Sequence, residues 1–209
     1  YFVFNSHYLQ KYFMLFNRSM LVEFPFFAAG INYFPGEISA LRVFEPRYLL
    51  LIGDSIINSK NFLVGRNMEE LGQVVSEVEI LEHQDISNAE QLVVIECKNL
   101  YKVKEISIDN EYPLCKVGDH NDVGLPPEVD QLEILEKNIK KMTAKLIEQG
   151  LNTNIPEFLV DSDNRINKLW ELCIYTPMDL KTKNYILNQN DIFKRYEILV
   201  NYVDSILTV

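Results

Sequence analysis

The sequence has few glycines and histidines, and this scarcity removes the common signatures of catalytic sites. Only eight glycines and three histidines occur among 209 residues. No G-x-x-x-x-G-K-[ST] phosphate loop, no G-x-G-x-x-G fingerprint and no G-x-S-x-G nucleophile turn is present. Neither H-E-x-x-H nor a pair of C-x-x-C clusters, the usual spacings of zinc ligands, occurs. We therefore expect no catalytic residue, no metal and no cofactor.

Cysteine is also sparse. Cys97, Cys115 and Cys173 are odd in number and widely spaced. Such a count does not build a disulfide framework and is typical of reduced thiols in the cytoplasm. We expect all three to be small buried apolar residues.

Long hydrophobic runs are missing as well. No stretch of 18 apolar residues exists, so we expect no membrane-spanning helix. The opening segment, residues 1–19, is aromatic-rich but lacks the charged start, apolar run and cleavage site of a secretory signal. Because Met20 stands just before an orderly pattern, our hypothesis is that residues 1–19 are an extension upstream of the true start.

Positive charge is scarce. The chain has 20 Lys and Arg against 30 Asp and Glu, a net charge of −10, which disfavours binding to nucleic acids or anionic membranes. Lys98, Lys102 and Lys104 form a local basic stretch around Tyr101, which favours a solvated strand face over a surface for nucleic-acid strands. His120 lies among acidic residues, and we interpret that cluster as a solvated turn rather than a cation site.

Residues 20–119 have mainly the pattern of β-strands. Apolar and polar residues alternate over 74–81, and residues 92–95 are a continuous β-branched run. The polar residues 82–91 between them predict the loop of a long hairpin. One helix interrupts this region, starting near Pro46 and ending at Asn58 and Ser59.

Residues 120–209 have the pattern of helices. The boundary is a Gly- and Pro-rich stretch within 118–127, after which apolar residues recur every three or four positions from Leu132 to Leu146. Further helices are predicted from Ile166, after an N-cap at Asp179 and after an N-cap at Asn190. A β-rich part followed by a helical part indicates the α+β class.

Three motifs in the β-rich part carry a family resemblance: Phe24-Pro25-Phe26, Tyr33-Phe34-Pro35-Gly36 and Phe44-Glu45-Pro46-Arg47-Tyr48. In this order and spacing they resemble the Lon substrate-binding domain, found at the N-terminus of Lon proteases and as small stand-alone bacterial proteins. The resemblance extends over roughly residues 21–207. It departs from the family pattern at Lys98 and Leu100, where the family has glycine and arginine, and at residues 84–90, which replace a short Asp-Gly turn.

The resemblance implies an N-terminal pseudo-β-barrel (PUA-like) domain with one helix, followed by a C-terminal α-helical bundle. It also implies a non-catalytic, cytoplasmic recognition module of protein quality control that binds peptides or unfolded protein segments. The ATPase and Ser-Lys peptidase parts of Lon have no counterpart in these 209 residues. Two alternatives stay open. One is an adaptor or scaffold whose helical half docks a protease or chaperone or a second copy of the chain; the other is a hydrolase with an unrecognised site.

Five residues of these motifs are candidate peptide contacts: Phe26, Phe34, Phe44, Arg47 and Tyr48. Arg47 could pair with a carboxylate and the aromatic rings could line an apolar groove. The alternative is structural, with the rings in the core and residues 44–48 forming a strand-to-helix junction.

Overall fold

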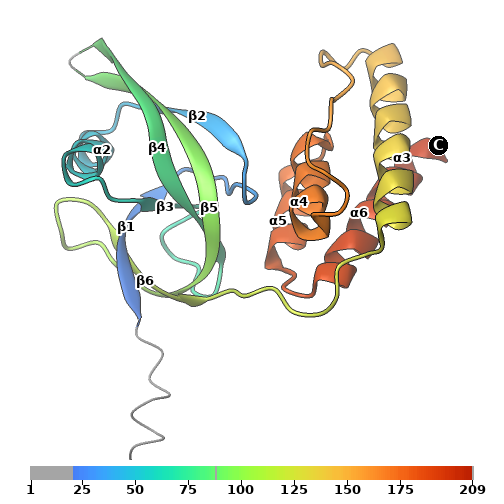
Figure 1. Cartoon of the computed structure of the whole chain (residues 1–209). Helices are drawn as coiled ribbons and strands as arrows, with labels where there is room; N and C mark the ends of the chain where they lie inside the picture. The colour runs from blue at the N-terminus through green and yellow to red at the C-terminus, as the bar shows by residue number, and fades with distance from the viewer. Residues whose placement is uncertain (1–20, 88, 209) are drawn as a thin grey trace, which may run out of the picture.

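The structure, a computed structural model, describes residues 21–87 and 89–208. Figure 1 shows the strands gathered on one side of the molecule and most of the helices on the other. The strands are β1 Val22–Ala28, β2 Ile38–Val43, β3 Phe62–Gly65, β4 Val74–Ser87, β5 Glu90–Ser107 and β6 Leu114–Asp119. The helices are α2 Pro46–Asn58, α3 Val129–Glu148, α4 Arg165–Tyr175, α5 Leu180–Asn188 and α6 Ile192–Leu207. The predicted α+β class is confirmed.

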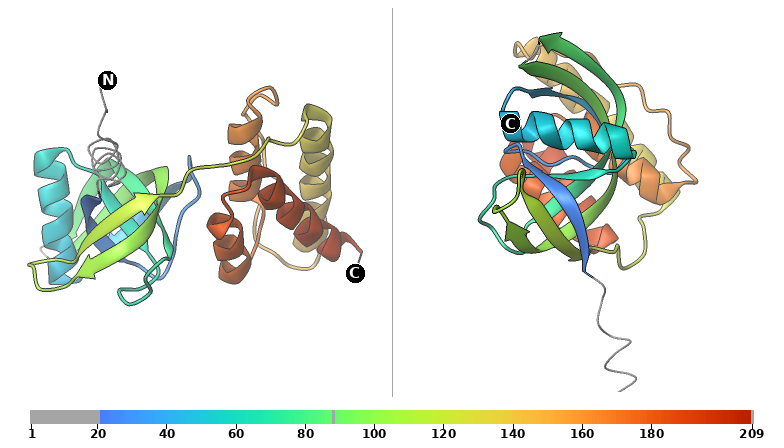
Figure 2. Two further views of the ribbon diagram at one scale, coloured as in Figure 1. Left: turned by 90° about the horizontal axis from the view of Figure 1, so that it is seen from below. Right: turned by 90° about the vertical axis from the view of Figure 1, so that its left-hand side faces the viewer.

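The six strands described form one sheet that closes on itself. Its order is β2-β5-β4-β3-β1-β6, and β6 pairs with β5 as well as with β1. β1 and β3 are parallel, whereas the other neighbouring strands are antiparallel. Figure 2 shows α2 lying across the outside of this closed sheet. β2 pairs only with β5 among the described strands, so its other edge has no strand beside it.

The β4–β5 hairpin is longer than the sequence indicates. Residues 82–91 were predicted to be a loop, and this prediction is wrong: Glu82 pairs with Val94 and Gln84 with Leu92 in a continuing ladder. The outer part of β4 is exposed, so polar side chains there are compatible with a strand. The polar composition of residues 82–91 reflects their exposure to solvent and does not indicate their backbone conformation.

The helices begin and end close to the predicted positions, with one correction. Asp179 caps α5 as predicted, accepting a hydrogen bond from the Thr182 N–H at 2.7 Å. The cap of α6 is Asp191, which accepts from the Lys194 N–H at 3.0 Å, and not the predicted Asn190. The Asn190 carbonyl oxygen instead accepts the Val123 N–H at 2.7 Å, joining the linker to the start of α6.

The strand part and the helical part pack against each other. Phe34, from the segment before β2, is buried in the apolar cluster of the helices. Lys183 of α5 forms an ion pair with Glu37 at 2.8 Å. His120, just after β6, contacts the Leu187 carbonyl oxygen at 2.9 Å through its Nε2 atom. These contacts fix the face of the sheet that the helices cover.

The predicted division at residue 120 stays a prediction, because Phe34 belongs to the first part by sequence and to the helical cluster by packing. The hypotheses on residues 1–19 and on Met20 lie outside the described residues. Within the residues that are described, no helix is both long and apolar enough to cross a membrane.

Candidate functional site

The five candidate contacts do not share one surface. Phe26 lies in the barrel core, Phe34 packs on Trp170 with ring centroids 5.8 Å apart, and Tyr48 packs on Phe27 at 4.1 Å. These three rings are at most 2% exposed, because each fills an apolar cluster. In this conformation they are not accessible to a peptide.

Phe44 and Arg47 remain accessible. Phe44 is 65% exposed, and the Arg47 side chain is 53% exposed and lies 3.9 Å from the carboxylate of Glu45. Both lie at the junction between β2 and α2, as the strand-to-helix alternative predicts. A contact with peptide stays a prediction for these two residues.

Lys98 of the basic stretch and Asp122 of the histidine cluster form ion pairs within the chain. Lys98 pairs with Glu79 at 2.9 Å and with Glu96 at 2.6 Å. Asp122, next to His120 in the predicted turn, pairs with the buried Arg195 at 2.6 Å. Over residues 21–87 and 89–208, no group of three or more metal-ligating side chains comes together.

All three cysteines are buried and unpaired. Burial raises the pKa of each thiol to about 12. A thiol with such a pKa stays protonated at neutral pH, whereas the thiolate is the nucleophile. Their placement therefore fits packing rather than catalysis.

An apolar cleft lies where the two parts of the chain meet, and we call it the inter-half cleft. Its volume is about 570 Å³. One wall comes from the start of β2 and the middle of β5, and the other from α4 and the loop before it. The lining residues are Pro35, Gly36, Ile38, Glu96, Cys97, Lys98, Leu159, Val160, Asn167, Glu171, Ile174 and Tyr175.

Large apolar side chains at this cleft are exposed to solvent. Leu159 is 85% exposed, Ile38 61% and Tyr175 47%. Single exposed apolar residues are ordinary, but a group of them around a concave surface is typical of a binding site. Ile38 comes from the strand wall, whereas Leu159 and Tyr175 come from the helical wall.

The loop wall of the cleft is held by a buried network of charges. The Glu171 carboxylate accepts hydrogen bonds from the Leu159 N–H at 2.5 Å and the Val160 N–H at 2.9 Å. Lys168 lies 3.0 Å from Glu171 and 2.7 Å from Glu136 of α3. Lys168 and Lys140, which lies 2.7 Å from Glu136, together balance the two carboxylates. The network therefore fixes the loop to the helices at the edge of the cleft.

The free edge of β2 leads away from this cleft. β2 begins with Ile38 at the cleft and ends one residue before Phe44. In Figure 1 the first end of β2 faces the helices and the last end lies near α2. Six strand residues span about 20 Å, a length that can pair with a short extended peptide.

Sequence reasoning missed the exposed apolar residues of the cleft, Ile38, Leu159 and Tyr175. Leu159 lies in a loop without periodicity, and Tyr175 is the last residue of its helix. The one available signal was the presence of large apolar residues in a segment with no helical or strand pattern. Only the tertiary structure places that loop across the cleft from β2, which is far away in the sequence.

Comparison with known proteins agrees with this architecture. The sequence pattern of the ATP-dependent protease La (LON) substrate-binding domain matches residues 23–205. The Lon N-terminal domain protein from Xanthomonas campestris, a crystal structure, is 21% identical with a TM-score of 0.64, over 87% of this chain and 99% of that chain. The N-terminal domain of the Mycobacterium avium complex Lon protease is 14% identical with a TM-score of 0.62, over 88% of this chain and 98% of that chain. No curated protein matches.

Proposed function

Because the chain belongs to the family of LON substrate-binding domains, we propose that it recognises extended, apolar segments of other proteins and does no chemistry on them. The inter-half cleft is the binding site. The observation that carries this proposal is the group of exposed apolar side chains, Ile38, Leu159 and Tyr175, around one concave surface.

Burial of apolar surface supplies the attraction in this scheme. Each large aliphatic side chain that enters the cleft gains about 1.5–3 kcal/mol from leaving water. Ordering a flexible segment offsets much of this gain, so we expect dissociation constants on the order of micromolar or weaker. Weak binding suits a module that samples many different segments.

The free edge of β2 extends the proposed site. A segment anchored at Ile38 could continue along β2 by backbone hydrogen bonds and reach Phe44 and Arg47 at its far end. Backbone pairing does not depend on sequence, whereas the cleft selects apolar side chains. The site would therefore favour apolar segments in extended conformation over any particular motif.

Recognition without catalysis fits the cysteines and the matched family. The matched region is a substrate-binding domain, and the Cys97 thiol in the cleft has a pKa of about 12. We infer that the module works in a reducing, cytoplasmic setting. Proteolysis of bound segments, where it occurs, would be done by other domains or chains.

Hydrogen exchange with a denatured model substrate, reduced carboxymethylated casein, tests the proposal. We expect protection of β2 and of residues around Leu159 when the substrate is added at about 100 μM. Leu159→Ser should weaken binding about tenfold or more, because it removes the most exposed apolar side chain of the cleft.

Leu125→Ser is the matched control, since Leu125 is 80% exposed and does not line the cleft. It should bind like the unaltered chain. Equal binding by both variants, or no change of exchange in β2, would contradict the proposed site.

An adaptor role is the second candidate, and the surface of α5 favours it. Leu180 is 53% exposed and Tyr185 57% exposed on this helix. Light scattering of the full chain measures self-association, which docking of a second copy through α5 predicts. Self-association that is lost in Tyr185→Ser while casein binding is retained would assign α5 to docking.

A further inference from the structure

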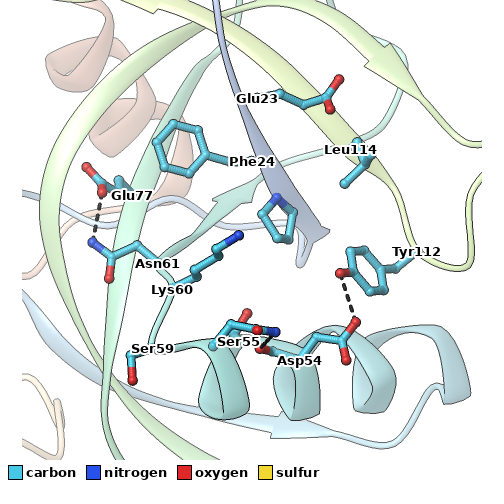
Figure 3. A pocket seen from close by; sticks show the side chains of 12 residues that line it. Glu23, Phe24, Asp54, Ser55, Ser59, Lys60, Asn61, Glu77, Tyr112 and Leu114 are labelled. Carbon is cyan, nitrogen blue, oxygen red and sulfur yellow. Dashed lines mark hydrogen bonds between the residues drawn. The ribbon is translucent and has the colours of Figure 1, made fainter.

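A second pocket lies on the barrel, and it differs from the inter-half cleft in position and chemistry. It is formed by the start of β1, the last turn of α2, the entry to β3 and the segment before β6, and its volume is about 570 Å³. Figure 3 shows its lining side chains. None of these residues lines the cleft.

Ser55 is the feature that points to a ligand. The residue is 3% exposed, it lines the pocket, and its Oγ atom has no hydrogen-bond partner among the described residues. A buried hydroxyl without a partner costs about 1–3 kcal/mol. In Figure 3 the Ser55 side chain lies under the Lys60 side chain, which reaches into the pocket.

Two carboxylates of the pocket already accept hydrogen bonds from neighbouring side chains. Glu77 accepts one hydrogen bond at each carboxylate oxygen, from the Asn61 amide at 2.8 Å and from the Asn99 amide at 2.7 Å. Asp54 has one oxygen engaged by the Tyr112 hydroxyl at 3.0 Å and the other free to accept.

Lys60 forms no ion pair within the described part of the chain, and neither does Glu23 at the start of β1. The Lys60 ammonium group and the carboxylates of Asp54, Glu23 and Glu77 thus all belong to residues that line the pocket. A ligand that satisfies both signs carries an anionic and a cationic group of its own.

Three apolar residues also line the pocket, beside the polar Asn58 and Ser59. Phe24, Pro25 and Leu114 offer no hydrogen-bonding side chain. A ligand that fits has a short apolar body beside its two charges. This combination describes an α-amino acid with an aliphatic side chain.

We propose that this pocket binds a small zwitterion of the aliphatic α-amino acid class. Its carboxylate contacts Lys60 and the Ser55 hydroxyl, and its ammonium group contacts Asp54. The side chain packs on Phe24 and Leu114. Binding here occupies the hydroxyl of Ser55 and leaves the inter-half cleft free.

The test measures binding of L-leucine to the full chain by calorimetry and by amide chemical shifts. We expect saturable binding at millimolar or lower concentration, with shifts at Ser55 and Lys60. Two analogues of the same body, 3-methylbutylamine and 4-methylpentanoate, each lack one charge and should bind at least about tenfold more weakly.

The leucine affinities of single-residue variants test which side chains form the site. Ser55→Ala and Lys60→Gln should each lower leucine affinity about tenfold. Lys137→Gln, on the exposed face of α3, should not change it. Leu159→Ser should leave leucine binding intact, which separates this test from that of the proposed function.

Three outcomes overturn the proposal: no saturation by leucine at about 10 mM, an analogue that binds as tightly as leucine, or unchanged binding in both Ser55→Ala and Lys60→Gln. Amide spectra of the variants show whether each is folded. If Ser55→Ala unfolds, the Lys60→Gln result and the analogue series decide.

Discussion

Single residues decide how tightly the barrel closes. Gly65, the last residue of β3, lies against the ring of Phe26. A Cβ atom added at Gly65 would come within 2.7 Å of that ring and 2.8 Å of Val75. Phe26, one of the candidate peptide contacts, thus has a packing role that requires glycine opposite it.

We expect Gly65→Ala to lower the free energy of unfolding by about 1–3 kcal/mol, because the core cannot accept the extra methyl group. Gly53→Ala is the control: Gly53 lies in α2, with nothing within 4 Å of an added Cβ. That change should stabilise the protein by about 0.5–1 kcal/mol. Urea denaturation measures both, and destabilisation by Gly53→Ala that equals that of Gly65→Ala would refute the packing account.

At the scale of elements, aspartate side chains cap the starts of α5 and α6. Asp191 rather than Asn190 caps α6, although both residue types are good N-caps. The difference comes from the linker, because the Val123 N–H bonds to the Asn190 carbonyl and the Ile192 N–H bonds to the Val123 carbonyl at 2.9 Å. These bonds fix the backbone so that Asp191 takes the cap position.

Asp191→Ala should therefore cost about 1 kcal/mol of stability, the usual effect of losing a cap. Asn190→Ala keeps the backbone carbonyl that the linker uses and should cost much less. Thermal unfolding of the two variants gives the comparison. The reverse ranking would mean that Asn190 is the cap in solution.

At the scale of the whole molecule, one aromatic residue joins the two parts. Phe34 leaves the strand region and packs on Trp170 among the helices, with Lys183 4.9 Å from the centre of its ring. The Lys183–Glu37 ion pair lies beside this contact. The walls of the inter-half cleft come from these same two parts, and packing at Phe34 helps to hold them together, with the ion pair and the His120–Leu187 contact.

Phe34→Ala should lower the free energy of unfolding by about 3–5 kcal/mol. It should also shift the fluorescence of Trp170, the single tryptophan, toward longer wavelength as water reaches it. Phe44→Ala should do neither, since Phe44 is 65% exposed. An unshifted spectrum in a folded Phe34→Ala protein would count against Phe34 as the link between the parts.

The sequence alone determined the class and the order of the elements. Periodicity of two before residue 120 and of three to four after residue 128 distinguished strands from helices, because burial of one face imposes these periods locally. The motif at Phe44–Tyr48 indicated the family, and Asp179 was identifiable as a cap because capping depends on neighbours within one turn.

Only the tertiary structure decided which aromatic residues are buried and where a binding surface lies. Phe26, Phe34 and Phe44 look alike in the sequence, yet two are in the core and one is in water. Burial depends on what another segment places against a side chain, and Leu159 reaches the cleft beside Ile38 from more than a hundred residues away. Contacts of this range are set by the packing of the whole chain, which no local pattern records.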